Sequence, residues 1–165
     1  DVAARFNNQQ GETFVLPKAQ IQKDAQIIPG TDGQKMSKSK NNTINVFLPE
    51  KKLRKQIMEI QTDSTPLEDP KDPDTCNVFA LYSLLGTEQQ ISDLRTLYCA
   101  GGMGYGHAKQ VLFELILDSF AEARTKFDYY QNNPAEVTIA LTKGAEKAKV
   151  IATDVMMRVR SKIGY

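Results

Sequence analysis

Residues 77–98 read NVFALYSLLGTEQQISDLRTLY, and this stretch decides the fold class. Its first part, residues 77–85, has the composition of a helix that stops at Gly86, and glycine commonly ends helices. Thr87 then stands where a side-chain cap is needed, and Gln90, three positions later, completes a capping-box pattern. The apolar stripe of this second helix has helical spacing and consists of Ile91, Leu94 and Tyr98. The stretch therefore predicts two helices joined by a short link.

The same periodicity predicts further helices on both sides of this stretch. They cover residues 1–10, 49–60, 107–131 and 134–162, with a break expected near Gly144. Several helices with short links and no sheet-length strands predict a mainly α fold that contains a helical bundle. The apolar positions expected to face inward are Leu53, Ile57, Ile60, Leu112, Leu115, Phe120, Ala123, Phe127, Ile151, Val155 and Val159.

The N-terminal part of the chain has a different pattern. Thr13–Leu16 is a short strand candidate, and residues 21–28 give a second extended stretch before the turn formers of Pro29–Gly33. The two glycines of this turn predict a mobile loop. We therefore expect a small α/β remnant over residues 1–45, followed by an all-helical region over residues 46–165.

Composition places the chain in a broad class. Its 165 residues have a hydrophobic share of 41% and a charged share of 25%, which are typical of a globular protein. The net charge of +1 does not by itself indicate a nucleic-acid or membrane partner. Such a partner would have to be recognised from local clusters of charged residues. No run approaches the roughly 20 apolar residues of a membrane span.

Cys76 and Cys99 show no ligand spacing, as expected of free thiols in a reducing cytoplasm. The helical pattern begins at Asp1 itself, without a start methionine or a helix cap before it. We therefore expect this chain to be a piece of a longer protein.

The segment Lys35-Met36-Ser37-Lys38-Ser39 carries the clearest chemical signal. Two lysines three positions apart in a tight turn project to one side and can hold a polyphosphate, with serine hydroxyls and backbone N–H groups as further donors. A loop that closes as charge builds on the phosphates stabilises the transition state selectively. Lysines in a polar loop are most often solvated surface, but accidental occurrence does not explain so specific a string.

This string is identical to the KMSKS loop of class I aminoacyl-tRNA synthetases, and further stretches resemble the tryptophanyl-tRNA synthetases in particular. The loop indicates class I in general, whereas the other stretches together favour tryptophan over tyrosine. They occur in family order and cover essentially the whole chain. These stretches are Asp1–Asn7, Asp32–Lys35, Thr62–Ser64, Asp69–Asn77, Gly104–Gly106 with Lys109, and Gly144–Ala148.

The resemblance implies a fold and a reaction. The fold is a helical anticodon-binding bundle preceded by a small remnant of a Rossmann-like α/β catalytic domain, which includes the loop. The reaction joins tryptophan and ATP into tryptophanyl-adenylate, releases pyrophosphate and passes the aminoacyl group to tRNA(Trp). Lys35 and Lys38 are the implied catalytic residues, which bind β- and γ-phosphate oxygens with the Mg²⁺ that accompanies ATP. Met36 is expected to anchor the loop by packing. The implied nucleotide-binding residues are Ile27 (or its neighbour Ile28), Lys35, Met36, Ser37, Lys38 and Ser39.

The resemblance also implies partners and a location. They are tRNA(Trp), tryptophan and ATP in a cytoplasmic full-length homodimer, without a membrane and without a metal site made by protein ligands. Basic groups that would contact RNA phosphates are Lys51, Lys52, Arg54 and Lys55, and also Lys143, Lys147, Lys149, Arg158, Arg160 and Lys162. Candidates for other RNA contacts, most of which we expect in the core, are Tyr98, Tyr105, Lys109, Phe127, Tyr129 and Tyr130.

The chain departs from the family pattern in one respect. It contains neither a His-Ile-Gly-His-type motif nor the tryptophan pocket, and its one histidine, His107, is expected to be a surface residue at a helix start. We therefore expect the chain by itself to be inactive. Two alternatives stay open, namely a non-catalytic RNA-binding module that kept the loop and a relative of the tyrosyl-tRNA synthetases.

Residues 62–75 are rich in Asp, Glu and Pro. They lack the central glycine and the terminal glutamate of a calcium loop. We expect an irregular, exposed crossing between helices.

Overall fold

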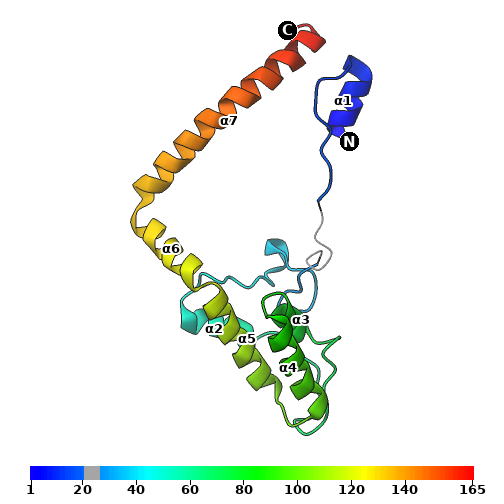
Figure 1. The fold of residues 1–165 in the computed structure, drawn as a ribbon, viewed down its shortest axis with the longest axis vertical. Coiled ribbons are helices and arrows are strands. Elements are labelled where there is room, and N and C mark those ends of the chain that lie inside the picture. Colours follow the sequence, from blue (N-terminus) through cyan, green and yellow to red (C-terminus); the bar gives the residue numbers. More distant parts are fainter. Residues whose placement is uncertain (21–26) are drawn as a thin grey trace. The chain divides into compact units, whose positions relative to one another are not determined.

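The computed structural model describes residues 1–20 and 27–165, and these residues are mainly helical (Figure 1). The predicted mainly α fold class is confirmed. The described residues form seven α-helices and the short 3-10 helix η2, which are α1 (Val2–Gln10), η2 (Lys38–Lys40), α2 (Glu50–Met58), α3 (Asn77–Ser83), α4 (Glu88–Ala100), α5 (Tyr105–Ser119), α6 (Ala121–Asn132) and α7 (Pro134–Ile163).

Contacts group the chain into two compact units. The central unit is Ile21–Phe127, and the terminal unit combines Asp1–Gln20 with Asp128–Tyr165. Helix α6 contributes residues to both units. The domain boundary expected after residue 45 stays a prediction.

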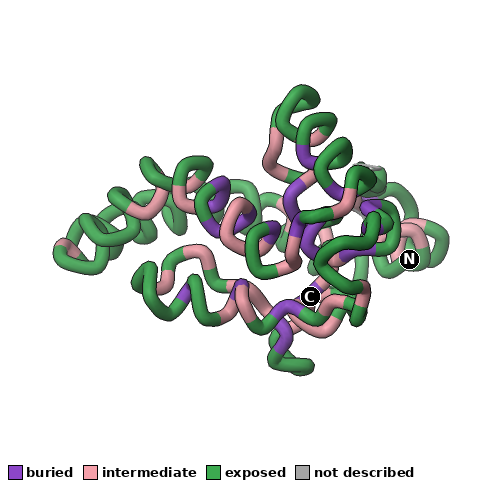
Figure 2. The backbone as a smooth tube through the Cα atoms, turned by 90° about the horizontal axis from the view of Figure 1, so that it is seen from below, coloured by how far each residue is buried: buried purple, intermediate pink, exposed green. Residues whose placement is uncertain are grey.

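The core of the central unit lies among α2, α3, α4 and α5, and α5 packs against both α2 and α3. Leu53 and Ile57, four positions apart on α2, are both completely buried. Tyr98 of α4 and Leu112 of α5 are also completely buried, and Figure 2 shows such buried positions in purple. Because burying one large apolar side chain contributes about 1.5–3 kcal/mol, the stripes predicted from the sequence hold this unit together.

Helix α4 begins with the predicted capping box. The Gln90 backbone N–H donates to Thr87 Oγ1 at 3.3 Å, and the Thr87 N–H donates to Gln90 Oε1 at 2.8 Å. The helix ends at Gly101, whose φ is 76°. A Cβ at this glycine would lie 2.4 Å from the carbonyl oxygen of Glu68, so the close passage of the α2–α3 connection requires glycine there.

The connection between α2 and α3 is irregular, as predicted, but it is not exposed throughout. Lys71 is only 4% exposed. Its Nζ donates to the carbonyl oxygens of Pro66 at 2.8 Å, Asp69 at 3.2 Å and Leu67 at 3.5 Å, and it lies 5.3 Å from the centre of the Tyr105 ring. A buried ammonium group must have its N–H donors satisfied. The prediction of exposure is therefore wrong at this lysine, because the connection folds around it.

The single helix predicted over residues 107–131 is divided in the structure. Helices α5 and α6 are separated at Phe120, whose φ and ψ are −107° and 11°. Arg124, in the first turn of α6, donates to the carbonyl oxygens of Val46 and Leu48, the second at 3.0 Å. These bonds attach α6 to the segment that precedes α2.

Helix α7 lies entirely in the terminal unit. It begins with Pro134, as predicted, and passes Gly144 without the expected break. A single glycine costs a helix only about 1 kcal/mol relative to alanine, which a helix of this length can tolerate. Val155 and Val159 are half-buried, but Ile151, also expected to face inward, is 70% exposed. In the part of the chain that the structure describes, no helix is both long and apolar enough to cross a membrane.

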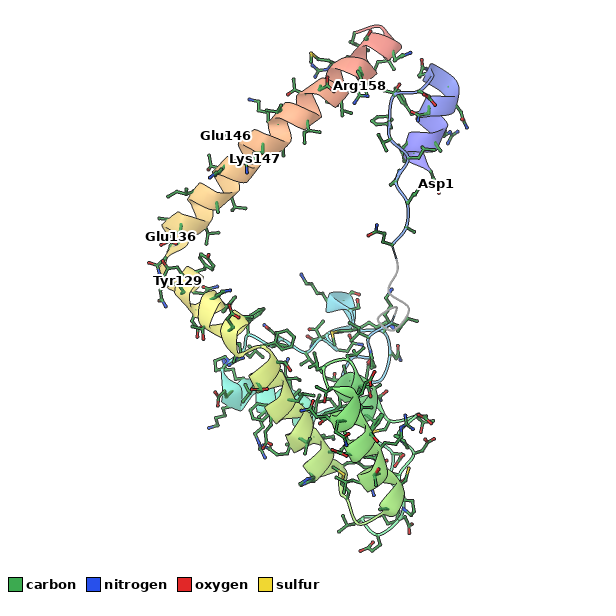
Figure 3. All side chains as sticks on the ribbon, viewed as in Figure 1. Asp1, Tyr129, Glu136, Glu146, Lys147 and Arg158 are labelled. Atoms are coloured by element: carbon green, nitrogen blue, oxygen red, sulfur yellow. The ribbon has the colours of Figure 1, made fainter. Side chains whose placement is uncertain are left out.

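The strand predicted at Thr13–Leu16 does not form. Asn7 Oδ1 accepts hydrogen bonds from the backbone N–H groups of Thr13 at 3.1 Å and Phe14 at 2.9 Å, and its Nδ2 donates to the Phe14 carbonyl at 2.8 Å. Arg158 of α7, labelled in Figure 3, donates to the Thr13 carbonyl at 3.1 Å. These side chains satisfy backbone groups that a sheet would otherwise pair.

Candidate functional site

A short hairpin forms the base of the predicted phosphate loop. The Met36 N–H donates to the Ile28 carbonyl at 2.8 Å, and an antiparallel bridge pairs Pro29 with Lys35. Of the extended stretch predicted over residues 21–28, residues 21–26 lie outside the described residues, and Ile28 forms no strand. The hairpin fixes the backbone at the first predicted catalytic lysine.

The tip of this hairpin is a tight, hydrogen-bonded turn. The Gly33 N–H donates to the Gly30 carbonyl at 3.0 Å, and Gly33 has a φ of 76°, which favours glycine. Asp32 Oδ1 accepts hydrogen bonds from the Gln34 backbone N–H at 3.0 Å and from Asn42 Nδ2 at 2.7 Å. The Asn42 bond, followed by the Gln34 bond, holds the pKa of the Asp32 carboxyl below its ordinary value. Asp32 is therefore anionic near neutral pH.

The second half of the loop is the 3-10 turn η2. The Lys40 N–H donates to the Ser37 carbonyl at 3.2 Å, and the turn ends at Asn41, which has a φ of 53°. The hydroxyl oxygens of Ser37 and Ser39 lie 2.8 Å apart and share a hydrogen bond. The turn thus brings two hydroxyl groups together beside Lys38.

The three lysines of the loop differ in their surroundings. Lys40 Nζ donates to Gln34 Oε1 at 2.6 Å. Lys35 and Lys38 are exposed, and neither ammonium group has a hydrogen-bond or ion-pair partner among the described residues. The two predicted catalytic lysines therefore present their charge to solvent, where an anionic ligand could bind. Their catalytic role stays a prediction.

Met36 points into an apolar groove on the helical body. The groove has a volume of about 360 Å³. It is lined by Ile28, Met36, Ile44, Val46, Leu81, Leu84, Leu85, Leu112, Ile116 and Phe120. This position agrees with the expected packing role of Met36. In contrast, Ile27 is 68% exposed, so its side chain is free of the core, and its assignment to the adenine stays a prediction.

Two further contacts attach the loop to the helices. The Gln61 N–H, just after α2, donates to the Thr31 carbonyl at 2.7 Å. A Cβ at Gly33 would lie 2.5 Å from Asn77 Nδ2 at the start of α3, so the turn passes very close to that helix. The hairpin is therefore fixed to both α2 and α3.

The predicted basic groups are largely solvent-exposed. On α2, Lys51, Lys52, Arg54 and Lys55 are all exposed, although Lys55 lies 3.9 Å from a Glu59 carboxylate oxygen. The C-terminal group lies on α7, where Figure 3 labels Lys147 and Arg158. Within that group, Arg158 pairs with Asp154 at 3.5 Å and also contacts Thr13, so it has a structural role. Arg54 Nε donates to Gln110 Oε1 at 2.9 Å, and exposed cations such as Lys51 and Lys52 are available for phosphate contacts.

The aromatic candidates for RNA stacking fall into two sets. Tyr98 is completely buried and is a core residue, and Phe127 stacks on Phe47 with ring centres 4.6 Å apart. Tyr129 and Tyr130 are 49% and 47% exposed, so they remain open to a ligand. The structure thus removes Tyr98 from the candidates for base contacts, whereas Phe127, expected to face inward, is 37% exposed.

The start of α5 carries three candidate residues, Tyr105, His107 and Lys109, whose surroundings differ. The Tyr105 hydroxyl donates to Asp63 Oδ1 at 2.8 Å, and burial, then this bond, raises the Tyr105 pKa to about 12. Lys109 Nζ donates to the carbonyl of Met58, the last residue of α2, at 3.0 Å, and burial lowers the Lys109 pKa. Cations stabilise helix C-termini, so Lys109 has a structural role. His107 is exposed, as predicted.

Two buried polar residues were missed by the sequence analysis. Asn42 is 2% exposed and bonds to the loop, and Lys71 supports the α2–α3 connection. The position of Asn42 after a Lys-Ser-Lys turn gave a weak signal, because Asn favours turns and local backbone bonds. Nothing in the sequence indicated the burial of Lys71, since lysine is rarely buried.

Comparison with known proteins identifies relatives over the whole chain. The family model for class I tRNA synthetases (W and Y) matches residues 1–121. Tryptophan–tRNA ligases of Fusobacterium nucleatum and Campylobacter jejuni are 46% and 45% identical, and in both cases the match covers 99% of this chain but only 50% and 51% of the relative. A crystal structure of tryptophanyl-tRNA synthetase from Campylobacter jejuni with ADP and tryptophan matches with a TM-score of 0.83 and 44% identity, over 99% of this chain and 51% of that one.

The chain thus spans about half the length of these relatives. The family match includes the hairpin, η2 and helices α1 to α5. It therefore covers the loop with its two exposed lysines and the helical body that holds it. We conclude that the chain belongs to the class I tRNA synthetases of the tryptophan and tyrosine group.

Proposed function

We propose that this chain is the C-terminal part of a tryptophan–tRNA ligase, whose complete protein activates tryptophan with ATP and transfers it to tRNA(Trp). The observation that carries this proposal is the loop geometry, in which Lys35 and Lys38 are exposed on a hydrogen-bonded base. The names of the relatives favour tryptophan as the amino acid. The chain alone is not expected to catalyse the reaction, because it lacks the family's His-Ile-Gly-His-type motif.

Lys35 and Lys38 would act on the leaving group. The carboxylate of tryptophan attacks the α-phosphorus of ATP, the bond to the bridging oxygen breaks, and pyrophosphate leaves with the electron pair. Negative charge therefore moves towards the β- and γ-phosphates, where two ammonium groups stabilise it. The hydroxyls of Ser37 and Ser39 would add hydrogen bonds. In the proposal, the backbone of Met36 lines the nucleotide while its side chain packs in the groove, and Ile27 lies beside the adenine.

Mg²⁺ would arrive with ATP. The loop offers N–H and O–H donors, which suit phosphate oxygens, whereas Mg²⁺ requires oxygen acceptors. We therefore place the ion on the phosphates and assign it no protein ligand.

The helical body would bind tRNA. In the proposal, residues 46–165 form the anticodon-binding domain and residues 1–45 the end of the catalytic domain. Exposed cations on α2, among them Lys51 and Lys52, would contact RNA phosphates and make affinity depend on salt. A cytoplasmic location and a full-length homodimer complete the proposal.

The test replaces Lys38 by alanine in the complete protein that contains this chain. Adenylate formation is measured by pyrophosphate exchange into ATP, and tryptophan affinity is measured separately. Removing one preorganised charge from a transition state commonly costs about 10²–10³-fold in rate, so we expect a loss of that order with little change in tryptophan affinity.

Lys52→Ala is the matched control, because it removes the same charge from an exposed site on α2. This control should keep the exchange rate while weakening tRNA binding and its salt dependence. Equal exchange rates in the Lys38→Ala and Lys52→Ala proteins would refute the role given to the loop. A complete protein that charges tyrosine in place of tryptophan would refute the assigned substrate.

A further inference from the structure

Asn42 stands out among the buried residues. Thr13, Asn42 and Lys71 are the buried polar or charged side chains of the described chain, and Asn42 alone of these lies at the loop. It is 2% exposed although it lies in a polar, glycine-rich segment. A polar side chain is buried at no net cost only when its hydrogen bonds are made, so its contacts show what it does.

The Asn42 side chain joins three separate points of the loop. Its Oδ1 accepts a hydrogen bond from the Ser37 N–H at 2.7 Å. Its Nδ2 donates to Asp32 Oδ1 at 2.7 Å and to the Lys35 carbonyl at 3.2 Å. The Asn42 carbonyl, in addition, accepts from the Thr31 N–H at 2.9 Å. One side chain therefore closes the loop on itself.

The pattern of donors and acceptors requires an amide. The Ser37 N–H needs an acceptor, whereas the Asp32 carboxylate needs a donor, so the orientation of the amide is fixed by its partners. Aspartate at this position would place two carboxylates against each other. The amide also packs tightly against the turn, because a Cβ at Gly30 would lie only 2.5 Å from the Asn42 side chain. Asparagine thus satisfies both the chemistry and the space.

Two of the anchored groups belong to the part of the loop that carries the cations. Lys35 is held through its own carbonyl, and Ser37 is the residue immediately before Lys38. We infer that Asn42 is a positioning residue for adenylate formation, which holds the backbone so that Lys35 and Lys38 face the leaving pyrophosphate. This inference rests on the proposed function and adds to it a residue that touches no substrate.

The expected effect is kinetic, because a small misplacement of a charged group lowers rate more than binding. A shift of about 1 Å at a group that stabilises the transition state can cost on the order of 10²-fold. In the complete protein, Asn42→Ala should therefore lower the rate constant of adenylate formation about 10- to 100-fold, with a smaller rise in KM for ATP and an unchanged KM for tryptophan.

The decisive experiment exchanges the two partners. Asn42→Asp alone should lose at least as much rate as Asn42→Ala, because it opposes the Asp32 carboxylate. The double variant Asn42→Asp/Asp32→Asn restores one donor and one acceptor between these positions while keeping the net charge and the acceptor for Ser37. The Lys35 carbonyl still loses its donor, so the recovery should be partial. It should recover about 5-fold or more of the rate lost by Asn42→Asp.

Rates are expressed per active site, which is counted from the burst of ATP consumption. A loss of active sites at an unchanged rate per site would mean that Asn42 only supports folding, and this would overturn the inference. A rate of Asn42→Ala within about 3-fold of the parent would overturn it too, as would a double variant no better than Asn42→Asp. If the unmodified complete protein forms no tryptophanyl-adenylate, the proposed function itself fails.

Discussion

Lys71 offers a sharp test of how the α2–α3 connection is stabilised. Replacing it by methionine keeps a long, flexible side chain but removes the ammonium group that donates to three carbonyl oxygens. We expect Lys71→Met to destabilise the central unit, because these carbonyls belong to the segment that lies against the end of α4. Gly102 N–H donates to the Leu67 carbonyl at 2.9 Å, and Lys71 N–H donates to the Tyr98 carbonyl at 2.8 Å.

The magnitude follows from opposing contributions. Two of the Nζ bonds, at 2.8 and 3.2 Å, are well formed, and a hydrogen bond from a charged donor contributes about 1.5–3 kcal/mol. Two such contributions would sum to about 3–6 kcal/mol, but they already include the cost of desolvating the ammonium group, contributions from one shared side chain do not add fully, and methionine keeps the apolar contacts of the side chain. The net expected loss is about 2 kcal/mol, or a fall in Tm of about 8–16 °C for a unit of this size.

Urea unfolding followed by circular dichroism measures the loss, and amide exchange locates it. The exchange of the Lys71 and Gly102 N–H groups should accelerate more than that of α7. Lys52→Met is the control, because Lys52 is exposed on α2 and should change stability by less than about 0.5 kcal/mol. Equal stability of the Lys71→Met and Lys52→Met proteins would refute the reasoning.

Three further changes test other contacts. Thr87→Ala removes the capping box of α4 and should cost about 0.5–2 kcal/mol in urea unfolding. Gly33→Ala should cost about 1–2 kcal/mol in the same assay, because its φ of 76° strains an alanine. Burial raises the Tyr105 pKa to about 12, so the folded state favours the neutral phenol. Its contribution to stability should be full below about pH 10, the ordinary tyrosine pKa, and should fall as pH rises towards 12. The stability advantage of the parent over Tyr105→Phe should therefore shrink between pH 10 and 12, and a constant difference would contradict this.

The helices of the central unit could be predicted because their signals are local. Apolar spacing placed Leu53 and Ile57 on one face, and the Thr87 capping box marked the start of α4. The break at Phe120 could not be predicted, since no glycine or proline marks it. The prediction of a strand at Thr13–Leu16 was wrong because the side chain of Asn7, only six and seven residues earlier, takes the backbone hydrogen bonds of Thr13 and Phe14.

The residues of the candidate site also fall into a part that the sequence predicts and a part that it does not. The identity of the loop residues predicts phosphate chemistry, because two lysines three positions apart in so specific a string are not explained by chance. The supporting residues could not be predicted from the sequence. The Asn42 side chain bonds to Asp32, ten residues earlier in the sequence. Gln61, which follows α2, bonds to the Thr31 carbonyl of the loop. Both contacts form only once the chain has folded.

Hydrogen bonds hold the loop backbone in this structure, whereas its lysine side chains are exposed; the mobility predicted from the two glycines stays a prediction. The Ser37 N–H and the Lys35 carbonyl both bond to Asn42, whereas the ammonium groups of Lys35 and Lys38 have no partner among the described residues. If these lysines bind phosphates as proposed, only side-chain rotamers need to be ordered when ATP arrives. That ordering costs at most about 2 kcal/mol for each lysine, whereas ordering the backbone of an unsupported loop would cost about 1–2 kcal/mol for each residue. Under the proposed function, the hydrogen bonds made by Asn42 would therefore assist catalysis by meeting most of this cost during folding, before ATP binds.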